Sequence, residues 1–83
     1  MNKIIISAKC PNNELFLSNL SLVSFCENIR EALIFDDIRS ARQSLSCRFL
    51  SFCYWIDKHE VENVYLCTLN ENKEIIGREK YEL

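Results

Sequence analysis

The hydrophobic positions between Asp37 and His59 follow the repeat of an α-helix. Apolar residues recur there at steps of three or four, and at ~100° per residue they fall within one narrow stripe. The stripe consists of Ile38, Ala41, Leu45, Phe49, Phe52 and Ile56. Asp36 or Asp37 can cap the first turn, because a carboxylate accepts hydrogen bonds from the free N–H groups of a helix start. The pattern predicts one long amphipathic helix over residues 37–59.

The segments on either side of this helix have the composition and alternation of β-strands. The expected strands are residues 3–9, 14–18, 64–69 and 74–82. Pro11 and the two asparagines after it are typical of a turn, so the first two strands form a hairpin. The last two form another, with Gly77 as a weak or bulged point. The expected fold is α+β: an antiparallel sheet of four to five strands with the long helix packed on one face.

Residues 19–35 allow two interpretations. As strand, Leu20, Leu22 and neighbouring apolar residues supply a further edge of the sheet. As helix, Ser24 and Glu27 make a capping box ahead of an apolar run that includes Leu33. We favour a strand near 21–26, then a turn of helix or loop, then extended chain into Phe35, with a helix throughout as the alternative.

Length and composition narrow the class of protein. A chain of 83 residues has room for one hydrophobic core, so we expect a single domain over residues 1–83. Five cysteines, an odd number, are scattered singly and no signal peptide precedes them, which favours reduced thiols in the cytoplasm. The longest apolar runs fall well short of the ~20 residues that a membrane span needs. No membrane partner is expected.

The sequence offers little for catalysis. His59 is the only histidine and lies at the predicted end of a helix, and with Gly77 as the only glycine no glycine-rich phosphate loop can form. Cys47 and Cys53 are six positions apart, which directs them to different sides of a helix, away from the close pairs of metal sites. We therefore expect a protein that is not an enzyme and that needs no cofactor or metal.

The second half of the predicted helix carries more apolar residues than one stripe can hold. Cys47, Leu50 and Tyr54 form a second stripe, and Trp55 lies on its flank. Because a helix that is apolar nearly all round is buried on more than one side, this surface needs a cover. Residues 19–35 or the terminal hairpin could supply it. The alternative is a protein interface, in a homodimer or with a larger partner, at these four residues.

Basic residues on the same helix suggest a rival class. Arg39 and Arg42 lie one turn apart, and Arg48 follows further round, so these side chains could contact an anion. Acidic residues nearby in the sequence could instead pair with them. The net charge of −2 gives no global attraction to nucleic acid, so a small nucleic-acid-binding regulatory protein is the alternative to a protein-binding module.

Four positions from Ile29 to Ala41 form the pattern I-x-x-A-x-x-F-x-x-x-x-x-A. The chain here resembles short uncharacterised α+β proteins of bacteriophages and related mobile elements, in which an N-terminal hairpin leads into such a segment and then an amphipathic helix. The resemblance transfers no functional residue. It implies a non-catalytic accessory protein that binds and inhibits a larger host or viral protein, such as a defence nuclease, as anti-CRISPR proteins do.

Overall fold

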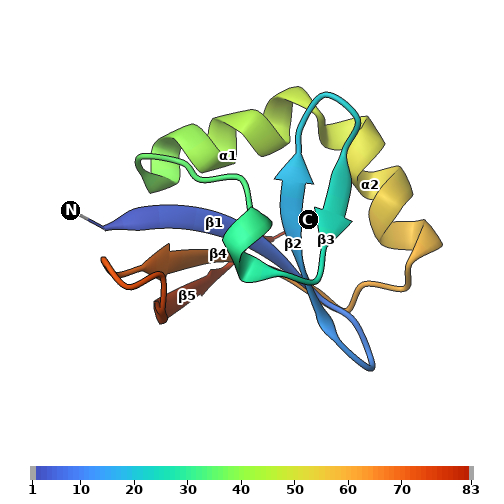
Figure 1. Cartoon of the computed structure of the whole chain (residues 1–83). Helices are drawn as coiled ribbons and strands as arrows, with labels where there is room; N and C mark the ends of the chain where they lie inside the picture. Colours follow the sequence, from blue (N-terminus) through green and yellow to red (C-terminus); the bar gives the residue numbers. More distant parts are fainter. Residues whose placement is uncertain (1, 83) are drawn as a thin grey trace.

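The computed structural model describes residues 2–82 and contains a five-stranded antiparallel sheet with helices on it (Figure 1). The strand order is β3-β2-β1-β4-β5, so the hairpin β1–β2 and the hairpin β4–β5 meet at the central β1–β4 pair. The elements are β1 (Lys3–Lys9), β2 (Glu14–Asn19), β3 (Ser24–Cys26), the 3-10 turn η1 (Ile29–Glu31), α1 (Ile38–Cys47), α2 (Phe49–Lys58), β4 (Asn63–Leu69) and β5 (Ile75–Lys80). The α+β class and both predicted hairpins are confirmed.

The two halves of the sheet diverge next to β1. This strand pairs with β4 along its whole length but with β2 only over residues 7–9. Residues 33–35 enter the gap as extended chain: the Leu33 N–H donates to the Leu17 carbonyl at 2.7 Å, and Phe35 and Ile4 exchange bonds of 2.9 and 2.8 Å. The predicted extended chain into Phe35 is therefore confirmed. Figure 1 shows β2 and β3 running steeply across the direction of β1 and β4.

The ambiguous stretch 19–35 forms a strand, a turn of helix and extended chain in the favoured order, but the strand covers Ser24–Cys26 instead of residues 21–26, and residues 20–23 form a turn. Leu17 of β2 pairs with Phe25 of β3, so the backbone around Phe25 is part of the sheet. The capping box at Ser24, part of the helix alternative, therefore does not form, and the alternative of a helix throughout is wrong. The Asn28 side chain instead caps η1 by accepting from the Arg30 N–H at 2.9 Å.

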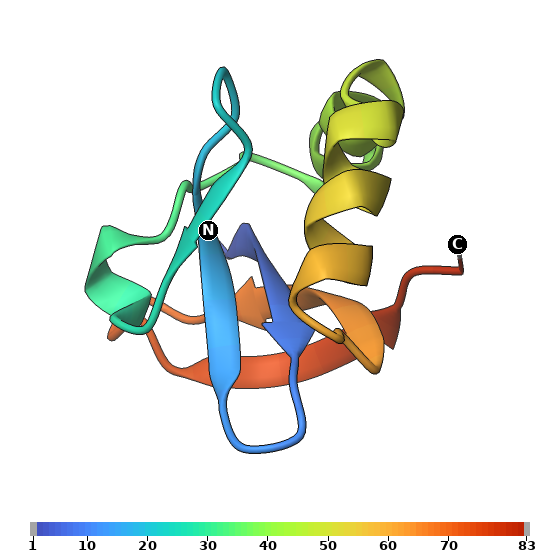
Figure 2. The same ribbon diagram turned by 90° about the vertical axis from the view of Figure 1, so that its right-hand side faces the viewer.

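The helical layer consists of two ten-residue helices, whereas the sequence pattern predicted one long helix. Asp37 caps α1 as expected and accepts from the Ser40 N–H at 2.7 Å. The helix breaks at Arg48, whose φ of −116° and ψ of 27° depart from helical values. Ser44 and Ser46 lie just before the break, and serine has a lower helix propensity than alanine or leucine. The bend keeps α1 against β1 and turns α2 along β3 (Figure 2).

The main core lies between the helices and the sheet. Its buried members come from both layers: Ile4, Ile6, Leu17, Ala41, Leu45, Phe52, Val64 and Leu66. Phe49 was expected to face this core, but its side chain is 42% exposed, so that prediction is wrong. Phe49 is the first residue of α2, directly at the bend, and the stacking of α2 on β3 is made further along by Phe52 and Trp55.

A smaller core lies on the opposite face of the sheet. The segment around η1 covers it with Ala32, which packs in a cluster with Ile5, Phe16, Cys67 and Leu69. Gly77 lies beside the predicted irregularity, because the β4–β5 register shifts between Thr68 and Leu69. Among the helices of residues 2–82, none is long and apolar enough to span a membrane.

Phe52 and Leu50 provide a matched test of the packing. Phe52 is 1% exposed and Leu50 84% exposed on the same helix. We expect Phe52→Ala to lower the free energy of unfolding by about 3–5 kcal/mol, because it leaves a cavity in the core. Leu50→Ala is expected to change it by less than about 0.5 kcal/mol. Urea denaturation followed by circular dichroism measures both; equal losses would contradict this placement of α2.

Candidate functional site

The outer side of α2 exposes large apolar side chains. Leu50 is 84% exposed and Tyr54 70% exposed, one turn apart, and the partly exposed Phe49 precedes them. Phe52 and Ile56 face the core, and Leu50 and Tyr54, each two positions before one of them and so rotated by ~200°, point away from it. We call Phe49, Leu50 and Tyr54 the apolar face of α2. An exposed group of this kind is a feature of binding surfaces.

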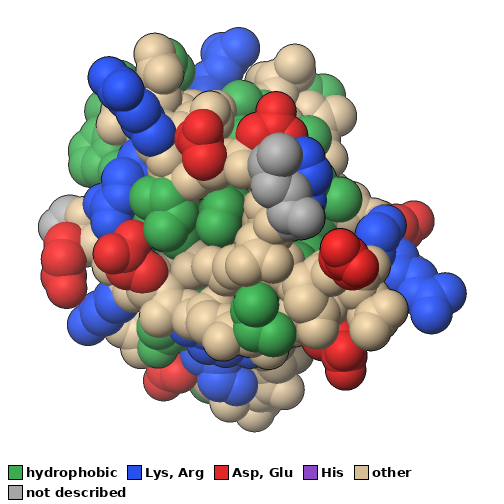
Figure 3. Space-filling model, turned by 90° about the vertical axis from the view of Figure 1, so that its left-hand side faces the viewer, with side chains coloured by type: hydrophobic (Ala, Val, Ile, Leu, Met, Phe, Trp, Pro, Cys, Tyr) green, Lys and Arg blue, Asp and Glu red, His purple; other side chains and the backbone are tan. Residues whose placement is uncertain are grey.

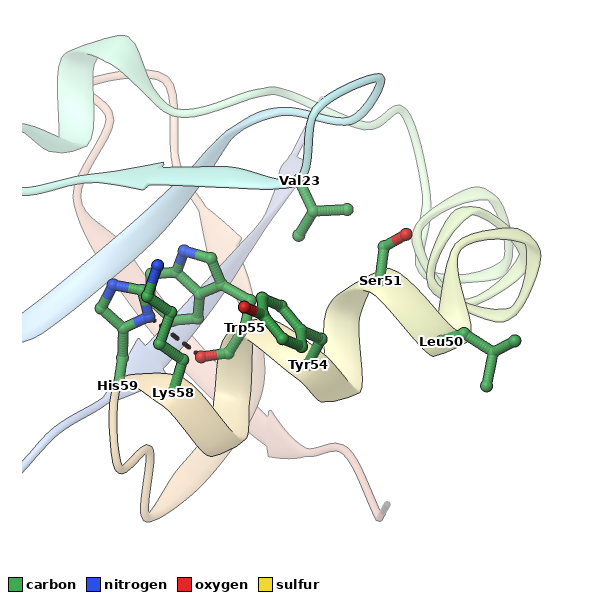
Figure 4. Close-up of a pocket in the computed structure, with 7 residues that line it drawn as sticks. All are labelled: Val23, Leu50, Ser51, Tyr54, Trp55, Lys58 and His59. Carbon is green, nitrogen blue, oxygen red and sulfur yellow. Dashed lines mark hydrogen bonds between the residues drawn. The ribbon is translucent and has the colours of Figure 1, made fainter.

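A groove of about 550 Å³ runs beside this face, between α2 and the start of β3. Its lining consists of Val23, Leu50, Ser51, Tyr54, Trp55, Lys58 and His59. Val23 approaches from the β3 side and the other six come from α2 and its C-terminal end (Figure 4). The groove is therefore mostly apolar, with a cationic side chain at its far end.

Trp55 belongs to a stack of four aromatic rings that joins α2 to β3. Phe25 lies between Phe52 and Trp55, with ring centroids 5.8 and 4.0 Å away, and His59 stacks on Trp55 at 4.1 Å. His59 Nδ1 also lies 3.0 Å from the Trp55 carbonyl oxygen (Figure 4). Trp55 thus forms a fixed wall of the groove. The spacing of four residues between Trp55 and His59 was the sequence signal for part of this stack.

The helix junction extends the same surface around the bend. A second groove, about 380 Å³, follows residues 46–51, and a third, about 440 Å³, lies between α1 and Leu20. Cys47 and Arg48 line both of these grooves. Leu22, in the turn between β2 and β3, is 79% exposed. Grooves therefore lie along both helices on the side of the molecule that carries the β2–β3 turn.

The predicted interface residues lie in two different environments. Cys47, Leu50 and Tyr54 are exposed. Trp55 is half-buried in the aromatic stack. The expected cover from residues 19–35 is partial, because Phe25 of β3 packs on Trp55 and leaves Leu50 and Tyr54 uncovered. Whether these residues bind a partner stays a prediction.

The three arginines predicted to contact an anion lie in different surroundings. All three are exposed on the helices, and Arg42 is already paired with Glu79 of β5 at 2.6 Å. This partner is 37 positions away in sequence, so nearby acidic residues gave no indication of it. Arg48 lines the grooves at the bend, whereas Arg39 lies near the start of α1. An anion-binding role for them stays a prediction.

A polar cluster lies on the opposite face of the sheet. The fully buried Ser7 donates to Glu14 at 3.1 Å and accepts from the Cys67 thiol at 3.4 Å. Arg78 donates twice to Glu14, with one bond of 3.0 Å. These arginine hydrogen bonds hold the pKa of Glu14 below its ordinary value, although partial burial opposes the shift. Burial raises the pKa of Cys67. The cluster is fully hydrogen-bonded, which is typical of a structural role.

One shallow groove brings together a cysteine, the histidine and a carboxylate. Cys10, His59 and Glu60 line it, near the β1–β2 turn. Burial, followed by the charge of Glu62, raises the pKa of the Cys10 thiol, so the group is protonated and a poor nucleophile. Within residues 2–82, no cluster of three or more histidine, cysteine or acidic side chains could hold a metal ion.

The fold and site together describe a small α+β domain with an exposed apolar helix face beside a groove. Comparison of the chain with protein-family models, with curated proteins and with solved structures gave no match. The residues that resemble phage proteins have packing positions here: Ala32 and Ala41 are buried, and Ile29 and Phe35 are half-buried against the cores. The resemblance therefore adds no residue to the site and stays a prediction.

The Glu14–Arg78 pair predicts a pH dependence of stability. Because the pKa of Glu14 is lowered in the folded chain, its contribution is present above the ordinary carboxyl pKa and is lost as the pH falls through the lower, folded value. We expect Glu14→Gln to destabilise the protein at about pH 7 and to differ less from wild type at about pH 3. Urea denaturation at both pH values measures the difference.

The matched control for this experiment is Glu71→Gln. Glu71 is exposed in the turn after β4, so its replacement reports the effect of removing one surface carboxylate. A difference between wild type and Glu14→Gln that stays constant with pH would contradict the proposed contribution of the pair.

Proposed function

We propose that this protein is a non-catalytic protein-interaction module that binds a larger partner through the apolar face of α2. The observation that carries the proposal is the exposure of Leu50 and Tyr54 beside a groove of about 550 Å³. Large apolar and aromatic side chains cluster at the centres of protein interfaces and are costly to leave in water. Leu50 and Tyr54 do not pack in the core, and binding a partner accounts for their exposure.

The packing of α2 supports a preformed binding surface. Phe52 anchors the helix in the core, and the stack of Phe25, Trp55 and His59 holds its second half against β3. The backbone that carries the apolar face therefore has little freedom to lose when a partner binds. A preorganised backbone raises affinity because less ordering entropy opposes association.

The chemistry of the molecule favours binding over catalysis. The buried cysteines Cys10 and Cys67 have raised pKa values, and His59 is engaged with Trp55 through both its ring and its Nδ1 atom. A catalytic site needs a nucleophile and a base within reach of each other. The groove beside α2 instead offers mostly apolar surface, with Ser51, Lys58 and His59 as its polar residues.

A narrower form of the proposal follows from the phage-like pattern of Ile29 to Ala41. In that form the partner is a host protein such as a bacterial defence nuclease, which this protein inhibits by occupying part of its surface. The narrower form depends on the resemblance, whereas binding through α2 depends on the exposed residues and the groove.

Site-specific photo-crosslinking tests the proposal in the cell of origin. With a photoreactive amino acid at position 54, we expect crosslinks to a discrete larger protein, because Tyr54 lies in the proposed contact. Adding Leu50→Glu is expected to abolish these crosslinks while leaving the free energy of unfolding within about 0.5 kcal/mol of wild type. Mass spectrometry identifies the crosslinked species.

The matched control places the same group at position 76. Ile76 is also a large exposed hydrophobic, at 56%, but it lies on β5 away from α2. Position 76 should give no such crosslink. Equal crosslinking from both positions, or none from position 54, would count against the proposed surface.

A further inference from the structure

The helices are locally basic in a chain that is acidic overall. Three arginines and no acidic residue lie between Ile38 and Ile56, although the net charge of the chain is −2. On the side of the molecule away from α2, basic and acidic side chains alternate around small hydrophobic patches (Figure 3). Residues 38–56 thus carry charge of a single sign, and a local charge of this kind can select a partner of opposite charge.

Two cations flank the apolar face of α2. Arg48 lies at the bend and lines the groove that also contains Leu50, and Lys58 lines the far end of the groove beside Tyr54. Ten positions along a helix separate these cations by ~15 Å. Asp57 is the acidic residue of α2, and the residues lining the three grooves of this surface do not include it. The sequence of features along α2 is therefore cation, apolar face, cation.

We propose that the occupant of this surface is an acidic segment of a partner protein that carries apolar side chains. The inference rests on the proposed function and specifies the chemistry of the partner. Apolar side chains of the segment contact Leu50 and Tyr54, and carboxylates before and after them meet Arg48 and Lys58. Charge complementarity at the two ends sets the position of the segment, and the apolar contacts supply most of the affinity.

A second copy of this chain fits the same surface less well. A two-fold interface through α2 would place the Arg48 end of one helix against the Lys58 end of the other if the helices are antiparallel, or against the partner's Arg48 end if they are parallel, and both arrangements bring like charges together. Nucleic acid would satisfy the cations but would leave Leu50 against a charged backbone. The paired Arg42 is also less available to phosphates.

A selection from a display library of random peptides, with the full chain as target, tests the inference. From wild type we expect peptides in which Asp or Glu residues flank apolar or aromatic ones. From the double variant Arg48→Glu/Lys58→Glu we expect peptides with the same apolar residues flanked by Lys or Arg. Leu50→Glu/Tyr54→Glu should enrich neither class, because the apolar contacts are lost.

Affinities of one selected acidic peptide, and of its twin with Lys at each acidic position, give the quantitative test. The Arg48→Glu/Lys58→Glu variant should bind the acidic peptide about tenfold more weakly than wild type does and should bind the Lys twin more tightly. Arg30→Glu makes the same kind of charge change on η1, on the opposite face of the sheet, and should leave both affinities unchanged. Circular dichroism and urea denaturation confirm that each variant is folded.

The possible outcomes separate this inference from the proposed function. Enrichment of neutral apolar peptides, with affinities insensitive to Arg48→Glu/Lys58→Glu, overturns the inference and leaves the binding function standing. Failure of wild type to enrich any peptide that depends on Leu50 and Tyr54 overturns both. Two other results would overturn the acidic segment as the occupant. One is a dimer in light scattering that Leu50→Glu dissociates. The other is a nucleic-acid gel shift that Arg48→Glu/Lys58→Glu abolishes.

Discussion

The structure depends on the way the sheet opens beside β1. That strand has a full-length partner in β4, but it pairs with β2 only over residues 7–9, and the chain at 33–35 supplies further hydrogen bonds to Ile4 and Leu17. Unpaired buried backbone groups would be costly, so this insertion is a condition of the fold. The same insertion brings the chain across the sheet to Asp37, where α1 begins. The position of the helices therefore follows from a backbone requirement of the strands.

The bend at Arg48 is the second consequence of the divergent sheet. Leu45 of α1 and Phe52 of α2 are both buried in one cluster, although the helices on which they lie run in different directions (Figure 2). A straight helix could not follow both β1 and β3. Breaking it costs some helical hydrogen bonding but keeps both apolar stripes in the core. It also leaves Phe49 and Leu50 at the outside of the bend, where Leu50 is 84% exposed.

Packing and proposed binding are divided between opposite sides of one short helix. Phe52 and the aromatic stack with Phe25 hold α2 in place, so the exposed side chains of Leu50 and Tyr54 are free of any role in the core. This division explains why changes on the two sides should have different effects. It also means that a binding surface can change its specificity without a loss of stability, since rigid scaffolds tolerate substitutions at exposed positions.

The sequence by itself determined the local elements. Alternation defined the two hairpins, the Asp37 cap marked the helix start, and the excess of apolar residues after Leu45 identified Leu50 and Tyr54 as needing a cover. Those signals depend on residues close together in the chain. The helix break, the exposure of Phe49, the Arg42–Glu79 pair and the stacking of Phe25 on Trp55 depend on segments that meet only after folding. The tertiary structure decided them, because periodicity gives the direction of a side chain from its own helix but not what lies opposite it.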